Sequence, residues 1–401
     1  MLSHILVPHL KRHFVIADFT HGLHYSWDKC LGKVIPSKRL DRFLARAFIV
    51  VNPIYVGVSL IALWKLDVNL AEKMLPLLSM TLYFSAVGVG AEWGPDSDIM
   101  HLINTIITSG GTETGRNIHR KQTLRHTIFL KVVDVTFTLV DVTYFVIPIA
   151  MATMQLLFPC QVPFTESLFL PGTECHKPFL ESDIHFAVIR ILFALVELKQ
   201  FCQIVLVGAQ YAIYTLLVGC MYLWEELVGI CEVKKFTTDY RKVQVLQELL
   251  NSCTSSRIFP AYLATVPAMQ IISAYACIKH HDTMGIAHLA MAGLVFLDVF
   301  SFNMVLFTGS GKLRGKSASH LDWLKGKARG KMEKRFVKSL APLKIKFGSN
   351  FVDELTALVI QDFCSGCPGY RVTTRYPAYP ACFGIPGTRP GIANYPVYPA
   401  G

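Results

Sequence analysis

The chain has 401 residues, of which 52% are hydrophobic and only 17% are charged, whereas an average soluble domain carries about 25% charged residues. This composition excludes a soluble globular protein of this length, a disordered chain and a collagen. The net charge of +11 does not indicate nucleic-acid binding, because Lys and Arg gather on the cytoplasmic side of polytopic membrane proteins. We therefore predict an all-α polytopic membrane protein.

Runs of about 20 apolar residues predict transmembrane helices. The first six predicted spans are nearly free of charge, but the seventh contains Asp353, Glu354 and Asp362. A six-span protein, in which the seventh segment does not insert, therefore remains an alternative. The seven predicted spans, in chain order, cover residues 44–64, 74–91, 137–158, 200–224, 258–278, 284–307 and 347–363.

The two ends of the chain differ in composition from the transmembrane domain, which covers residues 44–363. Segment 1–43 is predicted to be a cytoplasmic N-terminal segment. Segment 364–401 is rich in Pro, Tyr and Gly, and this composition cannot continue a membrane helix. We expect an irregular or polyproline-like tail, and the interpretation that this tail is not native also stays open.

The distribution of cationic residues predicts the orientation. The segments 1–43, 92–127, 225–257 and 308–343 together contain 26 Lys and Arg, whereas the alternate loops and the approach to the fourth span contain 6. Because cationic loops stay in the cytoplasm, we predict a cytoplasmic N-terminus. This orientation is opposite to that of a G-protein-coupled receptor.

One acidic residue lies near the middle of the sixth span. Asp298 would cost on the order of 2.5–3.5 kcal/mol in contact with lipid, so we expect it to face a polar cavity or another helix. It either borders a ligand pocket or ion path, or makes a hydrogen bond that serves packing alone. Asp141, nearer the inner end of the third span, is expected to lie close to Lys131 or Arg125.

The predicted outer loop 159–185 is acidic and contains Cys160 and Cys175. On the oxidising outer side these two residues could form a disulfide. Two free thiols are the alternative, and the sequence leaves both open.

The number and orientation of the helices, and the long basic segment before the last one, resemble the arthropod gustatory and odorant receptor superfamily over residues 1–363. The gustatory branch tends to end with Thr-Tyr, several apolar residues and Gln-Phe. The segment Thr356-Ala-Leu-Val-Ile-Gln361-Asp-Phe363 is similar in order, but it has Ala357 in place of Tyr, a shorter spacing and an inserted Asp362. The resemblance implies a receptor subunit of the plasma membrane, with the gustatory branch favoured.

The same resemblance implies function and partners. Members of the superfamily are ligand-gated, non-selective cation channels that detect a small tastant or odorant and assemble as homo- or heterotetramers of related subunits. Their last helix lines the pore, and the matching positions are Leu358 as an apolar gate, Gln361 as a polar ring and Thr356 beside them. An apolar ring closes a pore by dewetting, and a neutral polar ring lets hydrated cations pass. An ordinary amphipathic helix end is the alternative.

The resemblance further implies a ligand pocket among the second to sixth helices. Aromatic residues within the spans can line such a pocket, although most aromatic residues serve packing or the membrane interface. The candidate pocket residues are Asp298, Tyr144, Tyr211 and Tyr275, and then Phe145, Tyr214 and Tyr262.

The segment from Lys312 to Lys346 is strongly basic and has apolar residues at helical spacing. It is expected to lie on the anionic inner leaflet, to contact neighbouring subunits, or to be a solvated loop. The pair His280-His281 and the lone Cys364-x-x-Cys367 motif do not predict a metal site.

Other classes of protein are less well supported. A secondary transporter with a site near Asp298 is the main alternative, but we find no inverted repeat. The sequence has no P-loop, G-x-S-x-G or H-E-x-x-H motif, so we predict neither an enzyme nor a bound cofactor.

Overall fold

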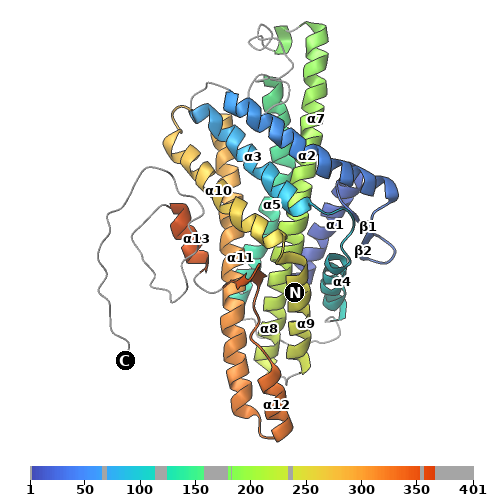
Figure 1. The fold of residues 1–401 in the computed structure, drawn as a ribbon, viewed down its shortest axis with the longest axis vertical. Coiled ribbons are helices and arrows are strands. Elements are labelled where there is room, and N and C mark those ends of the chain that lie inside the picture. Colours follow the sequence, from blue (N-terminus) through green and yellow to red (C-terminus); the bar gives the residue numbers. More distant parts are fainter. Residues whose placement is uncertain are drawn as a thin grey trace, which may run out of the picture.

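The computed structural model describes residues 2–65, 70–112, 124–157, 179–181, 183–233, 238–352 and 356–365. These residues form mainly long helices, most of which run along the long axis of the molecule (Figure 1). The elements are α1 (Leu2–Thr20), β1 (Tyr25–Asp28), β2 (Lys33–Pro36), α2 (Arg39–Lys65), α3 (Leu70–Gly90), α4 (Ser97–Thr112), α5 (Leu124–Leu157), η3 (Phe179–Glu181), α7 (Ile184–Ala209), η4 (Gln210–Leu217), α8 (Val218–Val233), α9 (Thr238–Thr254), α10 (Ile258–Lys279), α11 (Ile286–Lys327), α12 (Lys331–Ser339), β3 (Lys346–Phe347), β4 (Asn350–Phe351) and α13 (Thr356–Ser365).

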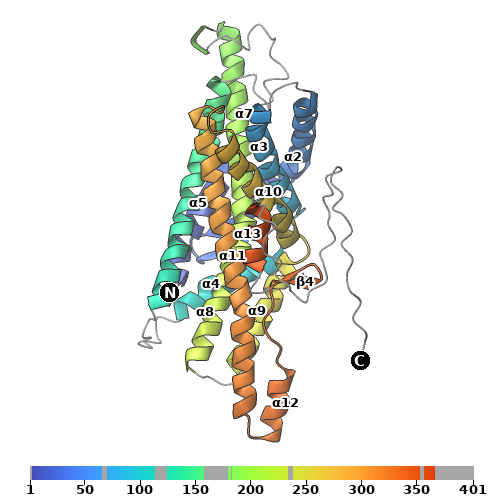
Figure 2. The same cartoon turned by 90° about the vertical axis from the view of Figure 1, so that its left-hand side faces the viewer.

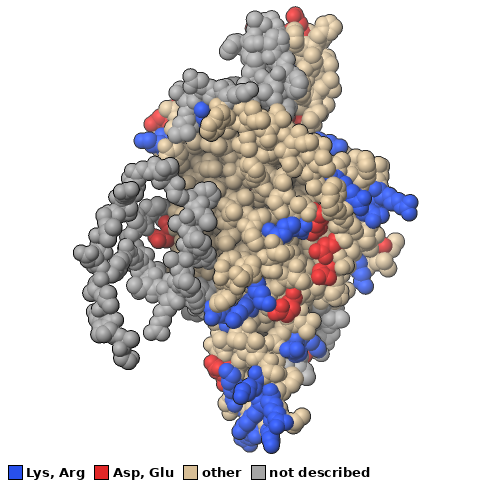
Figure 3. All heavy atoms as spheres, in the orientation of Figure 1, with Lys and Arg blue, Asp and Glu red and all other residues tan. Residues whose placement is uncertain are grey.

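Six helices in the described part of the chain are long and apolar enough to cross a membrane, which confirms the predicted all-α polytopic fold. They are α2, α3, α5, the continuous helix α7–η4–α8, α10 and α11. Apolar side chains such as Ile54 on α2, Ile149 on α5 and Leu192 on α7 point out of the bundle and are more than half exposed. A broad uncharged surface covers α2, α3 and α10 (Figure 3), as contact with lipid requires.

Several of these helices are longer than the predicted spans. The third, predicted for 137–158, begins at Leu124, and the sixth, predicted for 284–307, continues to Lys327. The fourth, predicted for 200–224, belongs to an uninterrupted helix over 184–233. The predicted spans follow runs without charge, so they leave out the parts of each helix in which the helical hydrogen bonds continue through charged residues.

Glu197 shows how α7 tolerates a charge. Its side chain is fully buried. Tyr55 of α2 donates a hydrogen bond to its Oε1 at 2.8 Å, and Tyr83 of α3 donates to its Oε2 at 3.5 Å. Because buried carboxylates need such donors, this contact ties α2, α3 and α7 together just before the predicted start of the fourth span.

The predicted start of the seventh helix at residue 347 is also wrong. Residues 346–351 form the hairpin β3–β4, with Gly348 in the left-handed region at φ +56°. The hairpin lies on α9, where Asn251 accepts a hydrogen bond from the amide of Lys346 at 3.0 Å. Among the described residues of this segment, α13 alone is helical, and its 10 residues extend about 15 Å, which is half the thickness of the hydrocarbon core.

Glu92, just beyond the end of α3, connects four parts of the chain. Its Oε2 accepts hydrogen bonds from Tyr25 of β1 at 3.0 Å and from Tyr211 of η4 at 2.8 Å. Its Oε1 forms an ion pair with Arg257, at the start of α10. His24 donates to its main-chain oxygen at 2.8 Å. The carboxylate therefore holds the first hairpin, α3, η4 and α10 together.

We predict that replacing Arg257 with Gln strongly destabilises the protein. The Glu92 side chain is only 10% exposed, and breaking a buried ion pair costs about 3–5 kcal/mol because the remaining charge loses its partner. The melting temperature of the detergent-solubilised chain would fall accordingly. Lys242→Gln is the matched control, because its pair with Asp239 is exposed and should contribute little. Equal effects of the two substitutions would contradict this role of Glu92.

Candidate functional site

A cavity of about 160 Å³ lies inside the bundle. Residues of α3, α5, α7, η4, α10 and α11 line it. Figure 2 shows α5 on one side of α7 and α11, and α3 and α2 on the other. The lining is mostly apolar, with Ile147, Ile213, Met269 and Phe302 among its larger side chains. An apolar cavity of about 150 Å³ is large enough to bind benzene, so this cavity fits a small organic molecule.

Asp298 of α11, for which the sequence left a cavity and a packing role open, lies in this mostly apolar lining. Its Oδ1 is shielded from solvent and has no hydrogen-bond partner among the described residues. The other polar side chains of the lining are Ser85, Thr143 and Tyr262. Asp298 is thus a carboxyl group at the wall of an otherwise apolar cavity.

A chain of amide side chains connects the cavity walls to α13. Asn303 of α11 donates a hydrogen bond to Gln270 Oε1 at 2.8 Å, and Gln270 of α10 donates to Gln361 Oε1 at 2.7 Å. Asn303 and Gln270 are buried, and each directly follows a residue of the cavity lining, Phe302 and Met269. These hydrogen bonds therefore link α11 and α10, beside the cavity, to α13.

The three candidate residues of the last helix lie on two sides of α13. Gln361 faces the bundle and takes part in the amide chain. Leu358, Val359 and Phe363 are exposed, Leu358 by 60%. Thr356 is the first residue of α13. α13 packs against α10 and α11 (Figure 1), so its exposed face points away from this subunit.

The tyrosines that the sequence suggested for the pocket lie mostly elsewhere. Tyr144 is buried and donates to His13, and Tyr211 donates to Glu92. Tyr275 is 42% exposed and packs against His280. Of the seven candidate residues only Asp298 and Tyr262 belong to the lining. Sequence reasoning missed Thr143 and Met269, because helix periodicity alone does not tell which buried face borders a cavity.

The N-terminal helix α1 enters the bundle through buried polar contacts. His9 donates to Asp141 Oδ2 at 2.6 Å, and Arg12 lies 3.1 Å from the same atom. The expectation that Asp141 lies beside Lys131 or Arg125 is therefore wrong, because α1, which the sequence did not place against α5, supplies the partners. Asp141 is buried.

His13 binds two transmembrane helices at once. Its Nδ1 accepts a hydrogen bond from Tyr144 of α5 at 2.6 Å, and its Nε2 donates to Gln210 Oε1 of η4 at 3.0 Å. Both contacts suit the neutral imidazole. Burial lowers the pKa of His13 to about 3, although Gln210 and Asp141 act in the opposite direction.

The segment η4 is a π-helix between these contacts and the cavity. π-Helices are rare and occur frequently at functional sites. Ala212 and Ile213 line the cavity, while Gln210 and Tyr211 bind α1 and Glu92. The wider turn thus places neighbouring residues on two separate surfaces. The segment η4 therefore lies between the cavity and the N-terminal helix α1.

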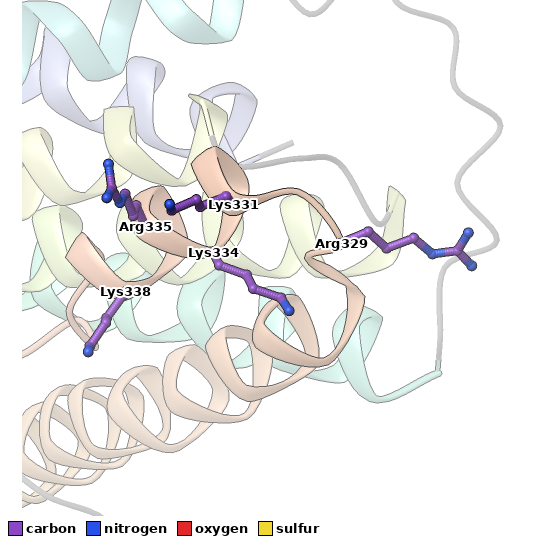
Figure 4. Close-up of a pocket in the computed structure, with 5 residues that line it drawn as sticks. All are labelled: Arg329, Lys331, Lys334, Arg335 and Lys338. Carbon is purple, nitrogen blue, oxygen red and sulfur yellow. The ribbon is translucent and has the colours of Figure 1, made fainter.

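A group of cationic side chains lies at the end of the molecule that α12 forms. The residues Arg329, Lys331, Lys334, Arg335 and Lys338 surround α12 and its start. Figure 3 shows this end as a dense group of cationic side chains. In Figure 4 Arg329 points away from the others, and Lys334 and Lys338 point in different directions. The five side chains do not converge on one point.

The described part of the chain contains neither the predicted disulfide nor a metal site. Cys160 and Cys175, the predicted disulfide, lie outside the described residues. The described residues contain no group of His, Cys, Asp or Glu arranged to hold a metal ion. Cys30, Cys202, Cys220, Cys231, Cys253, Cys277 and Cys364 are free thiols.

We predict that acid destabilises the protein through His13. An unfolded His has a pKa near 6.5, so the low folded value means that stability is complete above about pH 6.5 and falls as the pH drops toward 3. The loss at pH 5 is about 2 kcal/mol. His13→Gln should reduce the difference in melting temperature between pH 7 and pH 5, whereas His281→Gln, an exposed control, should leave it unchanged. An unaltered pH dependence in His13→Gln would refute this account.

Comparisons with known proteins identify the fold. No protein-family model matches the chain, and a search of curated proteins finds no match. Two solved structures of the insect olfactory receptor OR5 from Machilis hrabei are similar to it, each over 91% of this chain and 97% of the receptor at 12% sequence identity. The TM-scores are 0.53 for the receptor and 0.50 for its complex with eugenol. The chain therefore has the fold of an insect olfactory receptor, as its resemblance to that superfamily suggested.

Proposed function

We propose that this protein is a subunit of a ligand-gated, non-selective cation channel that detects small odorants. The observation that carries this proposal is the direct connection between the cavity and α13 through Asn303, Gln270 and Gln361. A binding site that only stored a ligand would not need such a connection. The fold, shared with a receptor solved in complex with eugenol, supports the same function.

Gating requires that the ligand bind the open state more tightly than the closed one. The cavity lies between helices whose facing side chains are mostly apolar, although Tyr262 of α10 donates a hydrogen bond to Gly208 of α7 at 2.7 Å. A ligand that displaces α10 relative to α11 would move Gln270 against Asn303. Gln361 follows Gln270, and α13 then changes its position at the proposed pore.

The proposed assembly is a homo- or heterotetramer in the plasma membrane with cytoplasmic N-termini. The excess of cationic residues in segments 1–43, 225–257 and 308–343 supports this orientation. The exposed face of α13 supports the assembly, because Leu358 and Phe363 lack cover from this subunit. In the tetramer Leu358 would form the apolar gate, with Thr356 and Gln361 nearby.

A gustatory receptor is the second candidate function, with a tastant as ligand. The order of residues from Thr356 to Phe363 favours it. A response to sugars or bitter compounds but not to volatile molecules would decide for the gustatory branch.

The first test is an electrical recording from cells that express the full chain. We expect a panel of small volatile molecules to evoke cation currents. Leu358→Ala should raise the current without ligand several-fold, because a smaller apolar ring is wetted more easily. Leu192→Ala, on the outer face of α7, is the control and should not change it. No current from any ligand or from Leu358→Ala would refute the channel function.

A second prediction concerns the transmission of the signal. Gln270→Met removes both amide contacts but keeps the length of the side chain, so the maximal ligand-evoked current should fall at least about fivefold. The stabilisation of the purified chain by ligand, read as a shift in melting temperature, should persist, since the cavity is intact. Gln200→Met is the control, because Gln200 pairs with Asn52 at 2.8 Å away from α13. Equal losses in both variants would contradict the coupling role of Gln270.

A further inference from the structure

Asp298 is the acidic residue of the cavity lining, and its carboxyl group interacts with the Thr143 hydroxyl. Its Oδ1 is out of contact with solvent and accepts no hydrogen bond from the described residues. The side chain sits in the lining beside Val295, Val299 and Phe302 of the same helix. An acceptor left unpaired in an apolar place is unfavourable, so a ligand that donates a hydrogen bond to Oδ1 would gain binding free energy.

Two hydroxyl groups of the lining donate to main-chain oxygens. Thr143 donates to the carbonyl oxygen of Leu139 at 2.9 Å, and Tyr262 donates to that of Gly208 at 2.7 Å. The Thr143 hydroxyl also interacts with the carboxyl group of Asp298. Because a hydroxyl group has a single hydrogen to donate, Thr143 cannot satisfy both acceptors at once, and Asp298 Oδ1 has no partner among the described residues.

We propose that the cavity selects small, mainly apolar molecules that carry one hydrogen-bond donor, a hydroxyl or an amine, and that this donor binds Asp298 Oδ1. This inference rests on the proposed function of the cavity as the agonist site. The aliphatic and aromatic lining accepts the carbon skeleton, and the carboxyl group fixes the orientation of the polar end. A molecule of the same shape without a donor fills the cavity but leaves Oδ1 unpaired.

The size of the cavity limits the skeleton. Its volume of about 160 Å³ is close to that of a cavity that binds benzene, about 150 Å³. The ligand class is therefore one aromatic ring, or an alkyl chain of similar size, with a short arm that ends in the donor.

The test compares ligands that share one carbon skeleton and differ in the donor. 2-Phenylethanol carries a neutral hydroxyl donor, 2-phenylethylamine carries an ammonium donor that is charged at neutral pH, and ethylbenzene has the same ring and carbon chain without a donor. In cells that express the full chain, the two donors should activate the current at concentrations at least about tenfold lower than ethylbenzene, as a hydrogen bond to a carboxyl group predicts. Asp298→Leu should remove this preference and leave the response to ethylbenzene equal or stronger.

Two controls separate this inference from the proposed function. Asp282→Leu changes an exposed carboxylate between α10 and α11 and should keep the preference. Thermal shifts of the purified wild-type chain measure the same preference without channel opening and without relying on a variant that folds. If ethylbenzene acts as well as the donors in both measurements, or if the preference survives in Asp298→Leu, the assigned ligand class is wrong while the channel function stands.

Discussion

A polar side chain inside an apolar helical bundle must find a partner within the protein, and this constraint organises the molecule. Glu197 joins α2, α3 and α7 through two tyrosines, and Glu92 joins the first hairpin, η4 and α10. The contacts connect segments that lie far apart in the sequence. Apolar packing fills the bundle, while these few carboxylates define which helices are neighbours.

The same constraint explains why the two sides of η4 differ. Toward α1, polar groups such as His13 and Gln210 are paired. Toward the cavity, small apolar residues such as Ala212 leave space. The hydrogen bonds of the paired side tie η4 to α1 and α5, whereas the other side of η4 borders the cavity. The helices α10 and α11, which also line the cavity, carry Gln270 and Asn303.

The sequence predicted the helical class and the approximate positions of six spans, because apolar runs are long and the bilayer demands them. It also indicated Asp298 as a candidate residue, because an acidic side chain near the middle of a span is costly in contact with lipid. It failed where partners come from distant segments: Arg12 for Asp141, or Tyr55 for Glu197. The amide chain from Asn303 to Gln361 could not be predicted for the same reason. The start of α13 depends on how residues 346–351 pack on α9.

The length of α11 has a mechanical consequence. Its 42 residues form a rod of about 63 Å, roughly twice the hydrocarbon thickness. One half carries Asp298 and Asn303, and the other ends beside the cationic turn of α12 (Figure 2). A rod of this length that tilts by about 5° about one end moves its other end by about 5 Å. In the proposed channel, a small tilt of α11 beside the cavity would therefore become a larger movement at its end beside α12.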